Sequence, residues 1–300
     1  MEVKKIARFT GHQGGIYKIS GGTEKSKILT YGGDGRIVEW DLDGLGDGVL
    51  RAKSDYKFFS GFYDRDSGSC YAGDMNGSVY RLIFHKETDN IQAWKPHSKG
   101  VFDIVKASSK LYSAGGDGTI TKWSDGPFFP EETRKVSDER MRTLLYDVER
   151  KLMLAGSSDG CIYLLDPESL KTVDRVDRAH ESTVFSMVFS GHGLLVTGGR
   201  DAQLNFWSYP DLKLLHRIPA HLFTVNDLAI SPCGNWLASA GRDKEVRIWD
   251  LKTYRLVKVI DRLKDGGHIN SVNAVYWDRQ SELLCTAGDD RTLMLWEVTP

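Results

Sequence analysis

The sequence predicts an all-β protein built from seven copies of one unit of short antiparallel strands. Apolar residues alternate with polar ones in short runs, as in 225–230, and turn residues such as Ser-Pro-Cys-Gly-Asn at 231–235 break the runs. The pattern recurs at steps of 42, 41, 42, 42, 42 and 47 residues. Such a period is typical of a repeat architecture. The aligned turn residues are Asp34, Asn76, Asp117, Asp159, Asp201, Asp243 and Asp290.

The two ends of the chain predict that the units close into a ring. Residues 2–9 form one strand-like stretch before the first unit, and the seventh unit stops soon after its third strand, at Trp296. The internal units each have a fourth strand, for example 213–218. We expect residues 2–9 to pair with the strand around 293–296, because closure removes an exposed edge. Residues 1–300 then make a single domain.

Composition narrows the class of protein. The chain has 300 residues, 40% of them hydrophobic and 27% charged, as is ordinary for a globular protein. Its 40 Lys and Arg against 41 Asp and Glu provide no global basic field for nucleic acid. The four cysteines form no CxxC pair, the start lacks an apolar signal core, and no stretch is long enough to span a membrane. We therefore expect a cytoplasmic chain with reduced thiols and no membrane partner.

Five units carry the same four side chains at nearly fixed spacing. A Ser or Thr precedes the turn Asp by four residues, a Trp follows it by six, and a His precedes it by 20 to 22. Ser, His and Asp also make a nucleophilic triad, but an enzyme needs one such site, not five. We predict a structural hydrogen-bond network and no catalytic residue. Its members are His12, Thr30, Asp34 and Trp40; His97, Ser113, Asp117 and Trp123; His180, Thr197, Asp201 and Trp207; His221, Ser239, Asp243 and Trp249; His268, Thr286, Asp290 and Trp296.

Units two and four depart from this pattern. Unit two has Ala72 and Leu82 where the hydroxyl and the Trp are expected, and unit four has Ala155 and Leu165. Ser137 falls near the histidine position of unit four. Local rigidity is in doubt there, and we expect loss of the turn acid to cost less stability in unit four than in unit six.

These residues resemble the WD-repeat family. The Trp-Asp ending stands at 40–41 and 249–250, Gly-His stands at 11–12 and 267–268, and seven copies cover the whole chain. The resemblance implies a seven-bladed β-propeller of four-stranded antiparallel blades. It also implies a non-catalytic scaffold that binds peptide segments or domains of other proteins, as a monomeric propeller within a larger complex.

Two other functions stay open. An enzyme would use acids on the inner strands at the channel, and Asp103 and Asp227 are the comparable candidates. A nucleic-acid-binding upper face is limited by the neutral charge and by few lysines at the relevant positions. No phosphate loop, catalytic elbow or metal-ligand spacing occurs in the sequence, so we expect no cofactor and no metal.

The histidine side of the ring, which we call the upper face, is the predicted binding surface. In each unit the residues three and five after the His, and the one before the turn Asp, point to the rim of the channel. Aromatic and arginine side chains dominate binding hot spots, and arginines bind carboxylates and phosphates. An acidic or phosphorylated peptide with an apolar anchor fits this set. The candidates are Tyr17, Met75, Phe102, Arg140, Arg142, Phe185, Arg200 and Arg242.

The sequence leaves two alternatives for the upper-face arginines and two for a pair of phenylalanines on the lower face. The arginines either present an open arc or pair with local acids such as Asp138, Glu139 and Asp289. On the opposite, lower face, Phe128 and Phe129 lie between two prolines. They either form an exposed docking knob or fold back under unit three.

Overall fold

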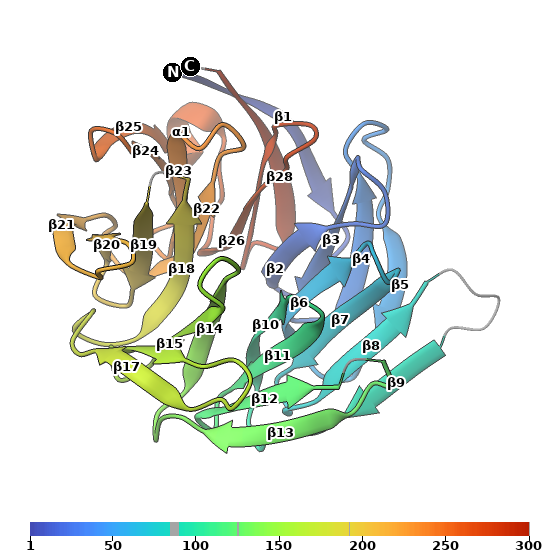
Figure 1. The fold of residues 1–300 in the computed structure, drawn as a ribbon. Coiled ribbons are helices and arrows are strands. Elements are labelled where there is room, and N and C mark those ends of the chain that lie inside the picture. Colours follow the sequence, from blue (N-terminus) through green and yellow to red (C-terminus); the bar gives the residue numbers. More distant parts are fainter. Residues whose placement is uncertain (85–89, 125, 192, 300) are drawn as a thin grey trace.

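The molecule is a ring of seven four-stranded antiparallel sheets, or blades, arranged around a central channel (Figure 1). The computed structural model describes residues 1–84, 90–124, 126–191 and 193–299. Each blade runs outward from its innermost strand in sequence order, and only blade seven takes a strand from elsewhere in the chain. The predicted fold class, a seven-bladed β-propeller, is confirmed.

The first four blades follow one another along the chain. Blade one contains β2 (Ile16–Gly21), β3 (Lys27–Gly32), β4 (Arg36–Asp41) and β5 (Val49–Lys53). Blade two contains β6 (Phe58–Asp64), β7 (Ser69–Asp74), β8 (Val79–Ile83) and β9 (Asn90–Trp94). Blade three contains β10 (Val101–Ala107), β11 (Lys110–Gly115), β12 (Thr119–Trp123) and β13 (Pro130–Lys135). Blade four contains β14 (Met141–Asp147), β15 (Leu152–Ser157), β16 (Ile162–Leu165) and β17 (Thr172–Val176).

The last three blades complete the ring. Blade five contains β18 (Val184–Ser190), β19 (Leu194–Gly199), β20 (Gln203–Ser208) and β21 (Leu214–Pro219). Blade six contains β22 (Val225–Ile230), β23 (Trp236–Gly241), β24 (Val246–Asp250) and β25 (Arg255–Ile260). A short helix, α1 (Arg262–Asp265), leads to blade seven, which contains β26 (Val272–Trp277), β27 (Leu284–Gly288), β28 (Thr292–Thr299) and β1 (Glu2–Thr10).

Ring closure occurs in blade seven, where the first and last strands of the chain meet. Strand β1 pairs antiparallel with β28, with Glu2 opposite Thr299 and Thr10 opposite Thr292. Figure 1 shows the two ends of the chain side by side at this blade. The pairing covers the predicted segments 2–9 and 293–296, so the predicted closure is confirmed.

The hydrophobic core lies between neighbouring blades. Each core cluster joins residues of adjacent sheets, and the tryptophans of the third strands, such as Trp123 and Trp296, are fully buried. Each blade buries apolar side chains on both faces of its sheet, one against each neighbouring blade. The seven sheets therefore form one continuous ring of packing, which fixes the strand ends that face the channel.

All seven innermost strands carry a β-bulge at the same position. The ladder with the second strand skips one residue in each blade, for example between Val101 and Asp103 in blade three. A bulge leaves one residue unpaired and redirects its side chain. The skipped residues are Tyr17, Phe59, Phe102, Arg142, Phe185, Asn226 and Asn273, and we call this set the channel rim.

Candidate functional site

The repeated quartet forms a hydrogen-bond chain at the upper end of five blades, as blade six illustrates. His221 Nδ1 lies 2.9 Å from Asp243 Oδ1, and His221 Nε2 lies 2.8 Å from Ser239 Oγ. The indole of Trp249 donates to the same hydroxyl at 2.9 Å. A proton on Nδ1 satisfies every group, because the hydroxyl then donates to Nε2 and accepts from the indole. The network joins the loop before the inner strand and the turn after the second strand to the second and third strands of the blade.

The other four blades of this kind place the remaining predicted residues in the same way. In blade three, His97 Nδ1 contacts Thr119 Oγ1 at 2.8 Å and lies 3.4 Å from the Asp117 carboxylate. The network residues are His12, Thr30, Asp34 and Trp40; His97, Ser113, Asp117 and Trp123; His180, Thr197, Asp201 and Trp207; His268, Thr286, Asp290 and Trp296.

The turn acids are ionised by these contacts. Partial burial raises the pKa of Asp34, but hydrogen bonds from His12 and from the Gln13 amide outweigh it and lower the pKa to about 2. The pKa of Asp290 is likewise lowered to about 2 against the effect of burial, chiefly by His268. An ionised carboxylate is the better acceptor, so the network is strongest when these acids are deprotonated.

Blades two and four contain a different network, which the sequence analysis missed. In blade four, Ser137 Oγ and the Tyr163 hydroxyl both donate to Asp159 Oδ2, at 2.9 and 2.6 Å. In blade two the Tyr80 hydroxyl donates to Asp74 Oδ2 at 2.8 Å. The sequence put the local rigidity of these two blades in doubt, and this network supplies a turn contact in each of them, because a tyrosine four residues after the turn position donates in place of the histidine.

The two networks differ in the residue that stands two positions before the turn position, on the second strand. A Cβ atom built on Gly199 or Gly241 would lie 2.4 or 2.2 Å from the histidine Nδ1 of its blade, far inside contact distance. In these two blades the histidine ring therefore requires glycine two residues before the turn Asp. Where the histidine is missing, this position carries Asp74 in blade two and Ser157 in blade four.

The channel rim contains four of the eight predicted upper-face residues, namely Tyr17, Phe102, Arg142 and Phe185. Tyr17 packs edge-on against Phe59 at 5.3 Å between ring centroids, and Phe59 stacks on Phe102 at 5.5 Å. Phe59 was not predicted, because blade two has no histidine from which to count. Ser54 stands 22 residues before Asn76, at the histidine position, and counting five residues from it would have found Phe59.

Arg142 continues this row between two aromatic rings. Its Cζ lies 3.9 Å from the ring centroid of Phe102 and 4.7 Å from that of Phe185, so the guanidinium makes a cation–π contact with each ring. Burial, and to a smaller extent the positive charge of Arg140, lower the pKa of Arg142 to about 10. The side chain remains charged near neutrality and is held in place by packing rather than by a carboxylate.

The predicted arginine arc, formed by Arg140, Arg142, Arg200 and Arg242, lies over one depression at the mouth of the channel. Arg140, Arg200 and Arg242 are exposed, and within the described residues no carboxylate approaches any arginine of the arc within 4.0 Å. Of the local acids that might have paired with the arc, Asp138 contacts Lys135, and Asp289 accepts a hydrogen bond from Asn273. The depression is lined by Tyr17, Phe59, Phe102, Arg140, Arg142, Phe185, Arg200, Thr224, Asn226, Arg242 and Asn273.

Three predicted residues lie outside this depression. Met75 is exposed on the upper side of blade two but does not line the depression. On the lower face, Phe128 is buried, because its ring stacks on Trp123 at 4.5 Å between centroids and packs beside Tyr71. Phe129 is exposed. The docking knob of two exposed rings is therefore wrong for Phe128, whose apolar surface completes the core between blades two and three.

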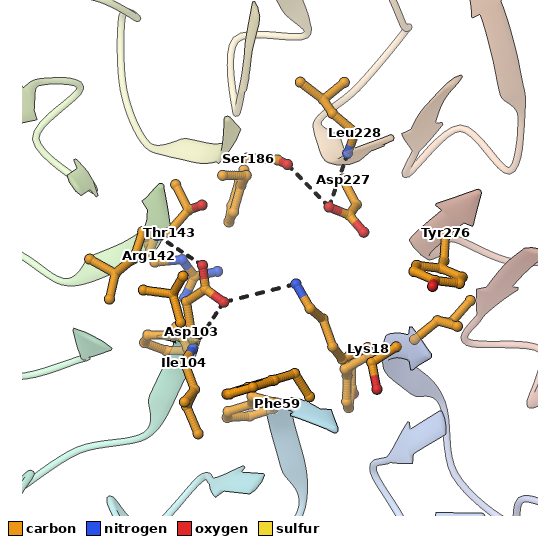
Figure 2. Close-up of a pocket in the computed structure, with 18 of the residues that line it drawn as sticks. Lys18, Phe59, Asp103, Ile104, Arg142, Thr143, Ser186, Asp227, Leu228 and Tyr276 are labelled. Carbon is orange, nitrogen blue, oxygen red and sulfur yellow. Dashed lines mark hydrogen bonds and ion pairs between the residues drawn. The ribbon is translucent and has the colours of Figure 1, made fainter. Parts of the chain in front are cut away.

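The inner-strand acids occupy the channel below the rim (Figure 2). Asp103 accepts the Leu144 amide of blade four, and Asp227 accepts the Val275 amide of blade seven, so each carboxylate connects two blades. Figure 2 shows Lys18 reaching toward Asp103, 3.9 Å away. Removal from bulk water opposes the charge on Lys18, yet Asp103 and Asp227 outweigh it and raise its pKa. The acids are occupied by structural partners.

Other kinds of site find no support in the described part of the chain. Its His, Cys, Asp and Glu side chains form no group of three suited to a metal ion. All four cysteines are unpaired. Across the same residues, no helix has the length and apolar character needed to cross a membrane.

Comparison with known proteins agrees with this geometry. The model of the "WD domain, G-beta repeat" family matches residues 171–208, 212–250 and 258–297. The crystal structure of the WD40 β-propeller domain of Doa1 superimposes with a TM-score of 0.87, covering 99% of this chain and 97% of that one at 16% identity. That likeness concerns the fold alone.

Curated relatives resemble part of the chain. WD repeat-containing protein 55 of Pongo abelii is 27% identical over 220 residues, which cover 71% of this chain and 57% of that protein. WD repeat and SOCS box-containing protein 1 of Homo sapiens is 35% identical over 107 residues, covering 35% of this chain and 24% of that protein. Nuclear distribution protein nudF of Aspergillus niger is 31% identical over 150 residues and is matched over 33% of its length. The matches thus span between about a quarter and somewhat over half of these relatives.

Fold and site together define a seven-bladed β-propeller with a polar network at the upper end of each blade. Residues 171–208, 212–250 and 258–297 match WD40 repeats, and the chain as a whole is similar to WD-repeat proteins in sequence and to a WD40 propeller in fold.

Proposed function

We propose that this propeller is a non-catalytic interaction scaffold whose upper face binds an acidic or phosphorylated segment of a partner protein. WD40 propellers generally act as protein-interaction scaffolds, and the relatives above are WD-repeat proteins. In this proposal the channel rim and the arginine arc form the binding surface. The arginines bind the acidic group of the ligand, and the aromatic side chains contact its apolar part.

The position of Arg142 carries the proposal. Phe102 and Phe185 both pack against its guanidinium, and the N–H groups of that guanidinium are the donors for a ligand. A carboxylate or phosphate accepts two parallel hydrogen bonds from such a group. Because the two rings already hold the side chain, little conformational entropy is lost on binding.

The aromatic side of the rim supplies the complementary apolar contact. Tyr17, Phe59 and Phe102 form a continuous row that ends at Arg142. Rigid aromatic side chains next to an arginine are the composition of a binding hot spot. A ligand with an apolar residue beside its acidic group satisfies both parts of this surface.

The channel acids favour a scaffold over an enzyme. Asp103 and Asp227 accept amides of neighbouring blades, and Lys18 lies beside Asp103. A general acid or base needs a carboxylate that can reach the substrate proton. Both acids are instead part of the interaction between blades, and we assign them that role.

Charge reversal tests the proposal. Arg142→Glu with Arg200→Glu should reduce capture of the native partners from lysate by at least about tenfold, because the ligand acid would then face a like charge. Arg200→Glu with Arg242→Glu tests the same surface at two exposed positions, without disturbing the aromatic contacts of Arg142. Lys252→Glu with Arg255→Glu, two exposed residues near the lower end of blade six, is the matched control.

The same captures define what contradicts the proposal. Retention of every partner by both upper-face variants, with melting temperatures unchanged, would exclude this surface. Arginine-dependent binding of a single-stranded RNA of mixed sequence, with no protein captured, would assign the arc to nucleic acid instead.

A further inference from the structure

Blades six and seven expose apolar side chains where the other histidine blades are polar. In all five of these blades, the amide after the histidine donates to the turn Asp, at 2.7 to 3.1 Å. This hydrogen bond therefore places the residue after the histidine on the upper face of each of the five blades. The residues are Gln13, Ser98 and Glu181 in blades one, three and five, but Leu222 and Ile269 in blades six and seven.

The apolar character extends to the next position in blade six. Leu222 is 76% exposed, Phe223 is 58% exposed, and Ile269 is 44% exposed. We call these three residues the apolar corner. The position of Phe223 is taken by Gly14, Lys99, Ser182 and Asn270 in the other four histidine blades. Adjacent exposed Leu and Phe on a loop already fixed by its network contribute nothing to the core, and such groups mark interaction sites.

The corner borders the arginine arc. Phe223 precedes Thr224, which lines the depression at the channel mouth, and the Thr224 carbonyl accepts the Arg242 amide at 3.0 Å. The loops of blades six and seven are joined where Asn226 donates to Ser271 Oγ at 3.0 Å. One continuous surface therefore runs from the aromatic rings of blades one to three, over the arginines of blades four to six, to the corner.

We propose that the apolar corner is a second anchor site for the acidic partner segment, so that the segment carries apolar residues on both sides of its acidic group. This inference rests on the proposed function, because it takes the acidic ligand of the arginine arc as the occupant. Charge complementarity selects that occupant over a second copy of this chain. A copy would bring a further arginine arc against the first, and like charges oppose such contact.

Peptide display with the intact chain tests the inference directly. A library of random 16-residue peptides is selected on the wild-type protein, and each recovered peptide is measured by fluorescence anisotropy against three variants. Leu222→Ser with Phe223→Ser removes the corner, and Arg200→Glu with Arg242→Glu disrupts the arc. Leu214→Ser with Leu215→Ser, 44% and 45% exposed on the outer strand of blade five, is the matched control.

The recovered peptides should be acidic and flanked by apolar residues on both sides. They should bind the corner variant at least about tenfold more weakly, which is the scale of losing one buried Leu or Phe contact, and the control variant with unchanged affinity. One of the two flanking apolar residues of the peptide should bind the corner. When that residue is replaced by Ser, the peptide should bind the wild type and the corner variant with equal affinity.

The contrary outcomes separate the two proposals. Peptides that lose affinity on the arc variant but not on the corner variant overturn the second anchor and leave the proposed function standing. Peptides indifferent to both variants, or a selection that returns none, overturn both. Self-association of the wild type in sedimentation velocity that the corner variant abolishes would assign the corner to a second copy of the chain.

Discussion

The five histidine blades and the two tyrosine blades stabilise the turn between their second and third strands with different hydrogen-bond donors. In the histidine blades an imidazole connects the turn Asp to a hydroxyl and a tryptophan, as at His221. In blades two and four a tyrosine on the third strand donates to an acid on the second strand or in the turn, as at Tyr163. Glycine on the second strand accompanies the imidazole, and Asp74 or Ser157 takes its place otherwise.

The rim, by contrast, has the same geometry in both kinds of blade. Phe59 in blade two and Arg142 in blade four occupy the bulge position that holds Tyr17 and Phe102 in histidine blades. The turn network and the residue at the bulge are therefore separate features. The network connects the turn to the strands of the blade, and the bulge presents a side chain to the channel rim.

The largest expected effect concerns blade seven, the one histidine blade whose outer strand comes from the other end of the chain. Deleting residues 1–9 removes most of β1 and exposes the edge of β28. The deletion should yield insoluble protein or lower the melting temperature by more than 10 °C, on the order expected for loss of several kcal/mol. A monomeric, cooperative melt identical to that of the full chain would contradict ring closure.

Removing the turn acid compares the two kinds of blade directly. Asp243→Ala leaves His221 and the Leu222 amide without an acceptor, and Asp159→Ala does the same to Ser137, Tyr163 and the Cys161 amide. Each should lower the free energy of unfolding by about 1–3 kcal/mol. This replaces the sequence-based expectation of a smaller loss in blade four, because Asp159 accepts three hydrogen bonds that the sequence did not indicate. Denaturant titration measures both losses. A loss below about 0.5 kcal/mol for Asp159→Ala would mean that the tyrosine network stabilises its blade less than the histidine network does.

Acid should weaken the histidine blades over a defined range of pH. The folded-state pKa of Asp34 and of Asp290 is about 2, below the value of about 3.9 for an unfolded aspartate. The unfolded chain therefore binds more protons in this range. The stabilisation is complete above about pH 5 and is lost as the pH falls through 4 toward 2. Asp290→Asn should reduce the slope of unfolding free energy against pH between 5 and 3, and an unchanged slope would exclude this contribution.

The smallest expected effect is the loss of one hydroxyl in a tyrosine blade. Tyr163→Phe keeps the ring in its core cluster but removes the donor to Asp159. It should cost about 1 kcal/mol, and the same exchange at Tyr56, an exposed tyrosine of blade two, is the control that should cost nothing measurable. Equal denaturation midpoints for Tyr163→Phe and the wild type would remove the hydroxyl from the network.

Features that recur in most of the seven units could be predicted from the sequence, and features confined to one or two blades could not. Seven units and the histidine network follow from spacing, because identical residues recur at fixed offsets, and ring closure follows from the surplus strand at residues 2–9. The tyrosine network escaped prediction because Tyr80 and Tyr163 recur only twice, and Phe59 escaped because its blade has no histidine to count from. Phe128 was misjudged because the sequence shows two neighbouring rings but not that Trp123 and Tyr71 border one of them.

The side-chain resonance of Arg142 offers the most direct measurement of the central claim, that the rim binds an acidic ligand. Ring currents of Phe102 and Phe185 should shift its Nε–H signal away from those of exposed arginines, and Arg142→Lys identifies it. Titration with a display-selected acidic peptide should move this signal to saturation, whereas the peptide with Asn and Gln for Asp and Glu should not. A peptide that binds while the Arg142 signal stays in place would contradict the account.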